Sequence, residues 1–306
     1  MLAANELATA ARRALLGSIV RGTRELADAD AAIRRGVPTC RRVNFVGLRG
    51  GVGVSTTAAS VATILAQRRP RRVLAVDGGA SRAVTLLTGA DAVPEPLEEA
   101  APSRRRTLPE RRPAAATSWE ATSALPASPI GLRVVAPEPT GARQASPAEW
   151  RTAVEPITRF FDVAVGDWGR RAPSVDLSAA VDDAHALALV ARADRFALEE
   201  AFAHVGAIRA RSGRAPLVVA VDVDGVGPAA SRAAGSWGLE PIHFVPFDSR
   251  YGTGSGAGAG SGAGAGAGRP AAQAVREAHI RLAAALIEAS LPPSSVAPGE
   301  KAEAPA

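Results

Sequence analysis

The chain has 306 residues, a formal net charge of +6 and 47% apolar residues, so it is long enough to bury a full α/β core in one domain. No apolar run approaches the roughly 18 to 20 residues that cross a bilayer, and the first residues do not form a secretion signal, so we expect a cytoplasmic protein. The single cysteine, Cys40, excludes an internal disulfide framework and a cysteine metal site. The histidines at positions 185, 204, 243 and 279 show no metal-ligand spacing.

The basic residues give only a weak indication of the partners. The sequence pI is about 10.8, which favours anionic partners such as nucleic acid, acidic proteins or phospholipid headgroups. Of the 36 basic residues, only Lys301 is a lysine, and this arginine bias lowers the information carried by any single arginine. No lysine before residue 301 is available to bind a phosphate.

The first segment, residues 1–41, predicts a basic helical region. Leu7, Ala11, Leu15 and Ile19 recur every four residues, with arginines between them. Two interpretations stay open. The segment packs on the domain as an ordinary helix, or it contacts a membrane surface or a partner protein as a basic amphipathic helix, which would place the protein at the membrane periphery.

A glycine-rich loop follows a short apolar strand at Val43–Val46 and leads into a helix of small residues that starts at Ser55. Glycines allow the backbone to turn with positive φ and to bring successive N–H groups close to an anion, and the helix points its positive end at the same place. The pattern therefore predicts a phosphate-binding loop. Such loops usually carry a lysine before the Ser or Thr, but Val54 occupies that position here.

This loop, RGGVGVSTT, resembles the deviant P-loop of the MinD/ParA family of dimerising ATPases, whose pattern is KGGxGK[ST]T. The resemblance implies a site for ATP or ADP with Mg²⁺, bound weakly or not at all because both pattern lysines are replaced. Arg49 stands at the signature position, which in the family reaches the partner's nucleotide across a homodimer. The implied nucleotide-binding residues of the loop are Gly50, Gly51, Val52, Gly53, Val54, Ser55 and Thr56.

Two strand ends extend the resemblance to the metal and the catalytic groups. The strand after the loop helix ends at Asp77, where the family has a DxD pair, but the second carboxylate is replaced by Gly79. The run FDVAVGDWG ends at Asp167, the Walker B position. The resemblance assigns Mg²⁺ to Ser55, Asp77 and Asp167, and catalysis to Arg49, Asp77 and Asp167. Because a carboxylate at position 79 would align the attacking water, its loss should slow hydrolysis severely.

Two later strands are expected to supply the base-binding residues. The apolar strand over 216–225 places Asp222 where family members carry an asparagine that reads the adenine edge. An ionised aspartate only accepts hydrogen bonds, so it could bind the adenine amino group but not donate to a ring nitrogen. The strand over 242–247 is followed by Asp248, in the loop that lines the base in the family.

The remaining segments complete an alternating pattern. We expect a strand at 131–139, a helix beginning near Pro147, and helices over 179–190 and 198–211. Residues 91–129 form a Pro, Ala and Arg-rich insertion that we expect to be largely disordered, with Trp119 as its apolar anchor. A Gly/Ala tether over 252–268 precedes a last helix over 271–290, and the tail 291–306 is expected to be disordered.

Together these elements predict a doubly wound, mainly parallel α/β sheet with helices on both faces, a P-loop NTPase fold of the MinD/ParA type over residues 42–290. The leading hypothesis is a nucleotide-binding protein impaired in ATP hydrolysis that acts by protein association, as a homodimer or with another protein. Leu48 and the arginine-rich lead into the first strand resemble MinD-like proteins of actinobacterial type VII secretion, so the setting would be secretion or polar positioning. Two alternatives stay open: an active ATPase that uses arginine in place of lysine, and a DNA-binding adaptor that uses Arg104, Arg105 and Arg106.

Overall fold

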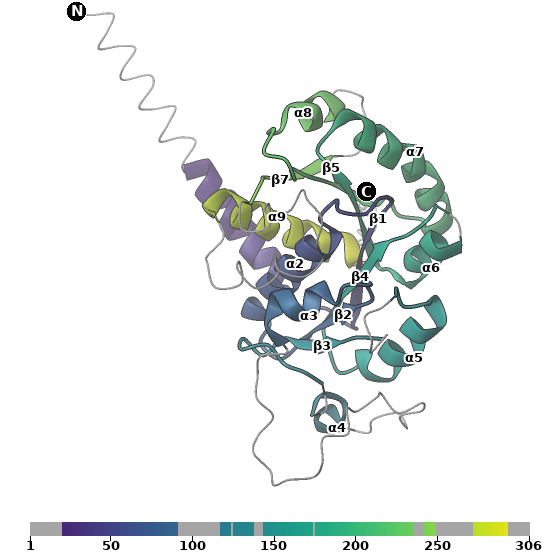
Figure 1. Ribbon diagram of the computed structural model, residues 1–306. Helices are drawn as coiled ribbons and strands as arrows, with labels where there is room; N and C mark the ends of the chain where they lie inside the picture. Colours follow the sequence, from purple (N-terminus) through teal and green to yellow (C-terminus); the bar gives the residue numbers. More distant parts are fainter. Residues whose placement is uncertain are drawn as a thin grey trace, which may run out of the picture.

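The computed structural model describes residues 20–90, 117–123, 125–137, 143–173, 175–235, 241–248 and 272–292 (Figure 1). The predictions for residues 1–19, for the arginine-rich part of the insertion at 91–116, for the tether over 252–268 and for the tail from 293 onward lie outside these residues.

The described residues form a seven-stranded sheet in the order β3-β2-β4-β1-β5-β6-β7, and every neighbouring pair is parallel. The central strands β4, β1 and β5 are buried along most of their length, as expected for a parallel sheet that is covered on both faces. The strands are β1 (Arg41–Gly47), β2 (Val73–Asp77), β3 (Arg133–Val135), β4 (Val163–Arg170), β5 (Ala186–Arg192), β6 (Leu217–Val221) and β7 (Ile242–Val245).

Helices pack on both faces of this sheet (Figure 1). One apolar core joins the sheet to α2 (Val54–Arg68), α3 (Ala83–Thr88), α9 (Gln273–Ser290) and a helix over residues 20–34. A second core joins the opposite face to α4 (Ser118–Thr122), α5 (Pro147–Thr158), α6 (Val175–Asp183), α7 (Arg195–Ser212) and α8 (Ala229–Gly235). The predicted doubly wound fold is confirmed, and the carboxyl ends of the strands meet at the edge where β1 passes into α2.

The prediction of one helix over residues 179–190 is wrong. Helix α6 ends at Asp183, and Ala186–Arg192 forms β5 between β1 and β6. The stretch is rich in Ala and Leu, which have high helix propensity, and a strand buried on both faces shows no alternation of polar and apolar residues that would distinguish it. Its position between two parallel strands decides its conformation.

The described part of the first helix packs against the domain. Ile33 is fully buried among residues of the core that includes α2 and α9. Arg69 donates from Nε to the Ile33 carbonyl at 2.6 Å, and Arg68 donates from Nε to Asp30 at 2.6 Å. Over residues 20–34, therefore, this segment is part of the α/β body.

The end of the expected insertion also takes part in the fold. Thr117 and Glu120 form a reciprocal capping box that starts α4, and Ala121 and Leu125 are buried. Trp119 is 75% exposed, so the apolar anchors of this segment are Ala121 and Leu125 rather than the tryptophan. Among the described residues, no helix combines the length and hydropathy that crossing a bilayer requires.

His185 lies at the amino edge of the sheet, where its Nδ1 accepts a hydrogen bond from the Arg42 backbone N–H at 3.0 Å. The pKa of His185 is lowered from 6.5 to about 4, mainly by burial and in addition by the charges of Arg42, Arg41 and Arg214, whereas Asp183 acts in the opposite direction. The imidazole therefore stays neutral in the folded protein at pH values where it is protonated in the unfolded chain.

Because the pKa of His185 is lower in the folded state, its contribution to stability is complete above pH 6.5 and is lost as the pH falls toward 4. In His185→Asn the amide oxygen can accept the same hydrogen bond, but the side chain does not titrate. We therefore expect the unfolding free energy of this variant to fall by about 1 to 2 kcal/mol less than that of the wild type when the pH is lowered, after allowance for solvent screening. Urea unfolding at pH 4.5 and pH 7.5 measures this. An equal loss in both proteins would contradict it.

Candidate functional site

The loop between β1 and α2 has the backbone conformation of a phosphate cradle. Gly51 and Gly53 have φ values of 72° and 90°, in the left-handed region that favours glycine, and Gly53 is the N-cap of α2. A β-carbon on Gly53 would lie 3.1 Å from Val221 Cγ1, so the loop also depends on the missing side chain for its close approach to β6. The backbone N–H groups in the first turn of α2 have no intrahelical acceptors, so they can donate hydrogen bonds to an anion.

A cavity of about 710 Å³ lies against this loop, a size suited to a nucleotide. Its lining includes six of the seven predicted loop residues, namely Gly50, Gly51, Gly53, Val54, Ser55 and Thr56. Val52 is the exception, because its side chain is buried and its Cγ2 would lie 2.9 Å from a β-carbon on Gly47. The two predicted base-site residues, Asp222 and Asp248, line the same cavity.

Val54 occupies the usual lysine position without filling the cavity. The side chain is 6% exposed, and its Cγ2 would lie 2.7 Å from a β-carbon on Gly47, so the isopropyl group packs against the end of β1. The loop therefore keeps its shape and its open space, but the helix contributes no positive charge from this position.

Asp167 lies in the carboxyl-terminal half of β4, three residues before its last residue, and is fully buried. Its Oδ1 accepts a hydrogen bond from the Gly169 N–H at 2.8 Å, whereas Oδ2 has no hydrogen-bond partner among the described residues. The pKa of Asp167 is raised to about 6, mainly by burial; the nearby Ser55 hydroxyl acts to lower this pKa, and the charge of Asp77 acts to raise it.

The surroundings of Asp167 Oδ2 fit a magnesium ion. A β-carbon on Gly79 would lie 3.2 Å from Asp167 Oδ2 and 3.7 Å from Ser55 Oγ, so the glycine leaves open a niche between these two oxygens. A carboxylate and a hydroxyl are hard oxygen ligands of the kind that Mg²⁺ uses beside phosphate and water. Asp167 and Ser55 would hold the ion, which would supply positive charge against the buried carboxylate and a bound phosphate.

The carboxylate of Asp77 is hydrogen-bonded by Thr85 of α3. Asp77 pairs in register with Asp167, as expected for neighbouring strand ends. However, Asp77 Oδ2 accepts hydrogen bonds from the Thr85 N–H at 2.8 Å and from the Thr85 hydroxyl at 2.7 Å. One carboxylate oxygen thus caps the first turn of α3 and is not directed at the niche beside Ser55.

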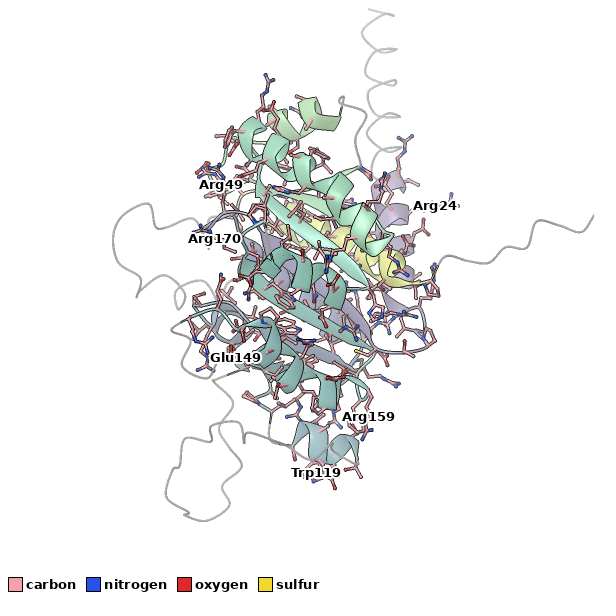
Figure 2. The ribbon with its side chains drawn as sticks, turned by 90° about the vertical axis from the view of Figure 1, so that its right-hand side faces the viewer. Arg24, Arg49, Trp119, Glu149, Arg159 and Arg170 are labelled. Atoms are coloured by element: carbon pink, nitrogen blue, oxygen red, sulfur yellow. The ribbon has the colours of Figure 1, made fainter. Side chains whose placement is uncertain are left out.

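Arg49 lies at the cavity but is bound to α7. Its Nε lies 2.6 Å from Glu200 Oε2, and its guanidinium carbon lies 4.7 Å from the centre of the Phe196 ring. In Figure 2 the labelled Arg49 lies beside α7, at the outer edge of the molecule. The structure therefore does not bring Arg49 together with Asp77 and Asp167, the other residues of the predicted catalytic group.

Asp222 organises the loop that follows β6. Its Oδ1 accepts hydrogen bonds from the backbone N–H groups of Asp224, Gly225 and Val226 at 3.3, 2.8 and 3.0 Å, and its Oδ2 accepts one from Gly227 at 2.8 Å. These four amides engage the carboxylate that the sequence assigned to the adenine amino group. The neighbouring Asp248 is partly buried.

Three features of the site were not predicted from the sequence. Arg170 at the end of β4 and His279 on α9 both line the cavity. Below the strand ends, Trp150 and Trp168 stack with ring centres 4.3 Å apart, and Trp150 also fills the space left by the missing side chain of Gly166. The place of Arg170 could have been predicted from the run Trp168-Gly169-Arg170 directly after Asp167, because residues that follow a carboxylate near a strand end lie at the edge of the sheet where ligands bind.

Comparison with known proteins extends these findings. No family model matches the chain. The ESX-1 secretion-associated protein EspI of Mycobacterium tuberculosis, in strains H37Rv and CDC 1551, is 31% identical over 149 residues, which are 46% of this chain. The chain spans only 20% of the length of EspI.

Several solved structures share the fold. The MinC:MinD cell division protein complex of Aquifex aeolicus matches with a TM-score of 0.54 and 18% identity, covering 79% of this chain and 96% of that one. The cell division ATPase MinD of Pyrococcus furiosus matches with a TM-score of 0.53 and 20% identity, covering 81% and 98%. MinD of Pyrococcus horikoshii, complexed with Mg-ADP, matches with a TM-score of 0.52 and 17% identity, covering 80% of this chain and 94% of that one. The chain therefore has the fold of these MinD structures.

The Asp222 contacts generate a prediction. In Asp222→Asn an amide N–H group replaces one acceptor oxygen, so at least one of the four loop amides loses its bond. We expect the unfolding free energy to fall by about 1 to 3 kcal/mol and amide exchange at residues 224–227 to accelerate. Asp224→Asn, which removes only an exposed pair with Arg192, serves as the control and should change stability by less than about 1 kcal/mol. Equal protection of these amides in Asp222→Asn and the wild type would refute the anchoring role.

Proposed function

We propose that this protein binds ATP or ADP together with Mg²⁺ on the loop between β1 and α2, hydrolyses ATP slowly at most, and acts by associating with a protein partner. The observation that carries the nucleotide part is Asp167 Oδ2. This buried carboxylate oxygen has no hydrogen-bond partner among the described residues and lies in a niche shared with Ser55, which lines the cavity. A buried anion of this kind is stable only when it is protonated or neutralised by a cation.

Phosphate binding does not require the missing lysine. The left-handed turns at Gly51 and Gly53 and the first turn of α2 supply main-chain donors and the positive end of a helix. The loss of one charge-assisted contact weakens binding by about 1.5 to 3 kcal/mol, or roughly 10- to 150-fold. Binding at millimolar nucleotide concentrations tolerates such a loss.

Hydrolysis requires more than binding, and the residues around the niche do not favour it. Gly79 contributes no carboxylate to orient an attacking water molecule, and one oxygen of Asp77 is engaged by Thr85. The catalytic power of such sites comes from positioning and from stabilising charge on the transferred phosphoryl group, and both are reduced here. We therefore infer a protein in which the bound nucleotide acts mainly as a structural ligand.

Association with a protein partner is supported by the relatives and by exposed apolar side chains near the cavity. EspI is described as secretion-associated, and the Aquifex aeolicus structure contains MinD with MinC. Phe196 and Val226 are 63% and 70% exposed, and Phe247 lines the cavity while remaining partly exposed. We infer a role in secretion or polar positioning. Contact with DNA or a membrane through Arg104, Arg105, Arg106 and residues 1–19 stays a prediction, because these lie outside the described residues.

A charge placed on the loop tests nucleotide binding. A β-carbon on Gly51 would meet no atom within 4 Å, and Asp and Asn both tolerate its left-handed backbone. We expect Gly51→Asp to weaken Mg-ATP binding by about 10-fold or more through repulsion of the phosphates, and Gly51→Asn to weaken it far less. Equilibrium dialysis at pH 7.5 with Mg²⁺ compares the three proteins. Absence of binding by the wild type at millimolar ATP would overturn the proposed nucleotide function.

Restoring the lysine provides the converse test. In Val54→Lys the ammonium group can regain the charge-assisted phosphate contact, so we expect affinity for Mg-ATP to rise roughly 10- to 150-fold. Val54→Met has a similar length without the charge and should leave the affinity near that of the wild type. If both substitutions change the affinity equally, the effect belongs to packing against Gly47, and the loop does not bind phosphate in the proposed way.

A further inference from the structure

The described arginines that line the cavity are Arg49, Arg170 and Arg192. Two of them are held by carboxylates on the protein. Arg49 pairs with Glu200, and Arg192 hydrogen bonds to Asp224. The guanidinium group of Arg170 makes no ion pair or hydrogen bond with any residue that the structure describes, and its side chain is exposed. Figure 2 places the labelled Arg170 and Arg49 on the same side of the molecule.

A bulge in β4 determines where Arg170 points. Opposite β1, Phe45 pairs with Asp167 and Gly47 pairs with Arg170, so β4 takes three steps where β1 takes two. The extra residue is accommodated by Gly169, whose φ is 63°. Alternate residues of a regular strand share a face, and one inserted residue shifts this alternation by one position. Arg170 is therefore brought to the face of β4 that carries Asp167.

The next residue, Arg171, is buried in the protein, whereas Arg170 is exposed at the cavity. Arg171 is 3% exposed, stacks on the Trp168 ring at 5.2 Å, and donates from Nε to the Trp168 carbonyl at 2.7 Å. Its Nη2 donates to the Ala145 carbonyl at 2.8 Å. Arg171 thus belongs to the buried side of the sheet, and the bulge divides two adjacent arginines between the core and the cavity.

From this geometry we propose that Arg170 binds the terminal phosphates of the nucleotide and supplies the positive charge that Val54 cannot supply from α2. This inference rests on the proposed nucleotide binding. A guanidinium group can donate two parallel hydrogen bonds to phosphate oxygens, so a strand-borne arginine is a chemically suitable substitute for a helix-borne lysine. The group contacts the ligand directly from the strand that also carries Asp167.

Arg170→Gln tests the assignment, with Arg170→Lys and Arg211→Gln as companions. Arg211 pairs with Asp182 on the protein surface and does not line the cavity, so its substitution matches the change in net charge. We expect Arg170→Gln to weaken Mg-ATP binding about 10-fold or more while weakening AMP binding less, because AMP lacks the terminal phosphates. Arg170→Lys should retain part of the affinity, and Arg211→Gln should retain all of it. Circular dichroism confirms that each variant is folded.

The outcomes separate this inference from the proposed function. If the wild type binds Mg-ATP and Arg170→Gln binds it equally well, Arg170 has no phosphate role and the proposed nucleotide binding still stands. If ATP and AMP binding weaken to the same extent, the residue acts on the shape of the site and the assignment fails. If Val54→Lys raises Mg-ATP affinity more in the Arg170→Gln background than in the wild type, the two positions supply the same charge and the inference is supported; equal increases in both backgrounds contradict it. Failure of the wild type to bind any nucleotide overturns both.

Discussion

The candidate site depends on one backbone constraint: the chain must turn from β1 into α2 without side chains where the loop is most crowded. Gly53 approaches Val221 of β6, and Gly47 receives the side chains of Val52 and Val54. The left-handed conformations of Gly51 and Gly53 set the direction in which α2 leaves the sheet. Because α2 packs through its buried residues against β1 and α9, the same turn fixes the helix end, the cavity and the core beneath them.

This constraint explains how the loop tolerates a valine in place of a lysine. Val54 is part of the apolar core and packs against Gly47, so its contribution is to stability and to the fixed position of the turn. The amides of the loop do not depend on which side chain follows Gly53. The shape of a phosphate site and its charge are thus separable properties, and in this chain the shape is kept while the charge must come from elsewhere.

The sequence was sufficient to predict the features that depend on local pattern. A strand, a run of glycines and a helix of small residues located the loop, and a carboxylate after an apolar strand located Asp167. The predictions that failed depended on tertiary neighbours. The stretch Ala186–Arg192 is a strand because β1 and β6 flank it, although its Ala and Leu residues favour a helix. Trp119 is exposed because Ala121 and Leu125 occupy the contact with the domain.

The roles of charged residues were also out of reach of the sequence, because they depend on partners that come from distant segments. Asp222 was expected to face a base, but four amides of its own loop surround it. Arg49 was assigned from its place in a motif, but Glu200, 151 residues later in the chain, binds it. Arg170 could be distinguished from Arg171 only through a register shift between two strands. A motif therefore locates a charged group along the chain, whereas the contacts around that group decide whether its charge is available to a ligand. At this edge of the sheet, the guanidinium group of Arg170 and Asp167 Oδ2 have no hydrogen-bond partner among the described residues, whereas the fold itself engages Arg49, Arg192 and Asp222.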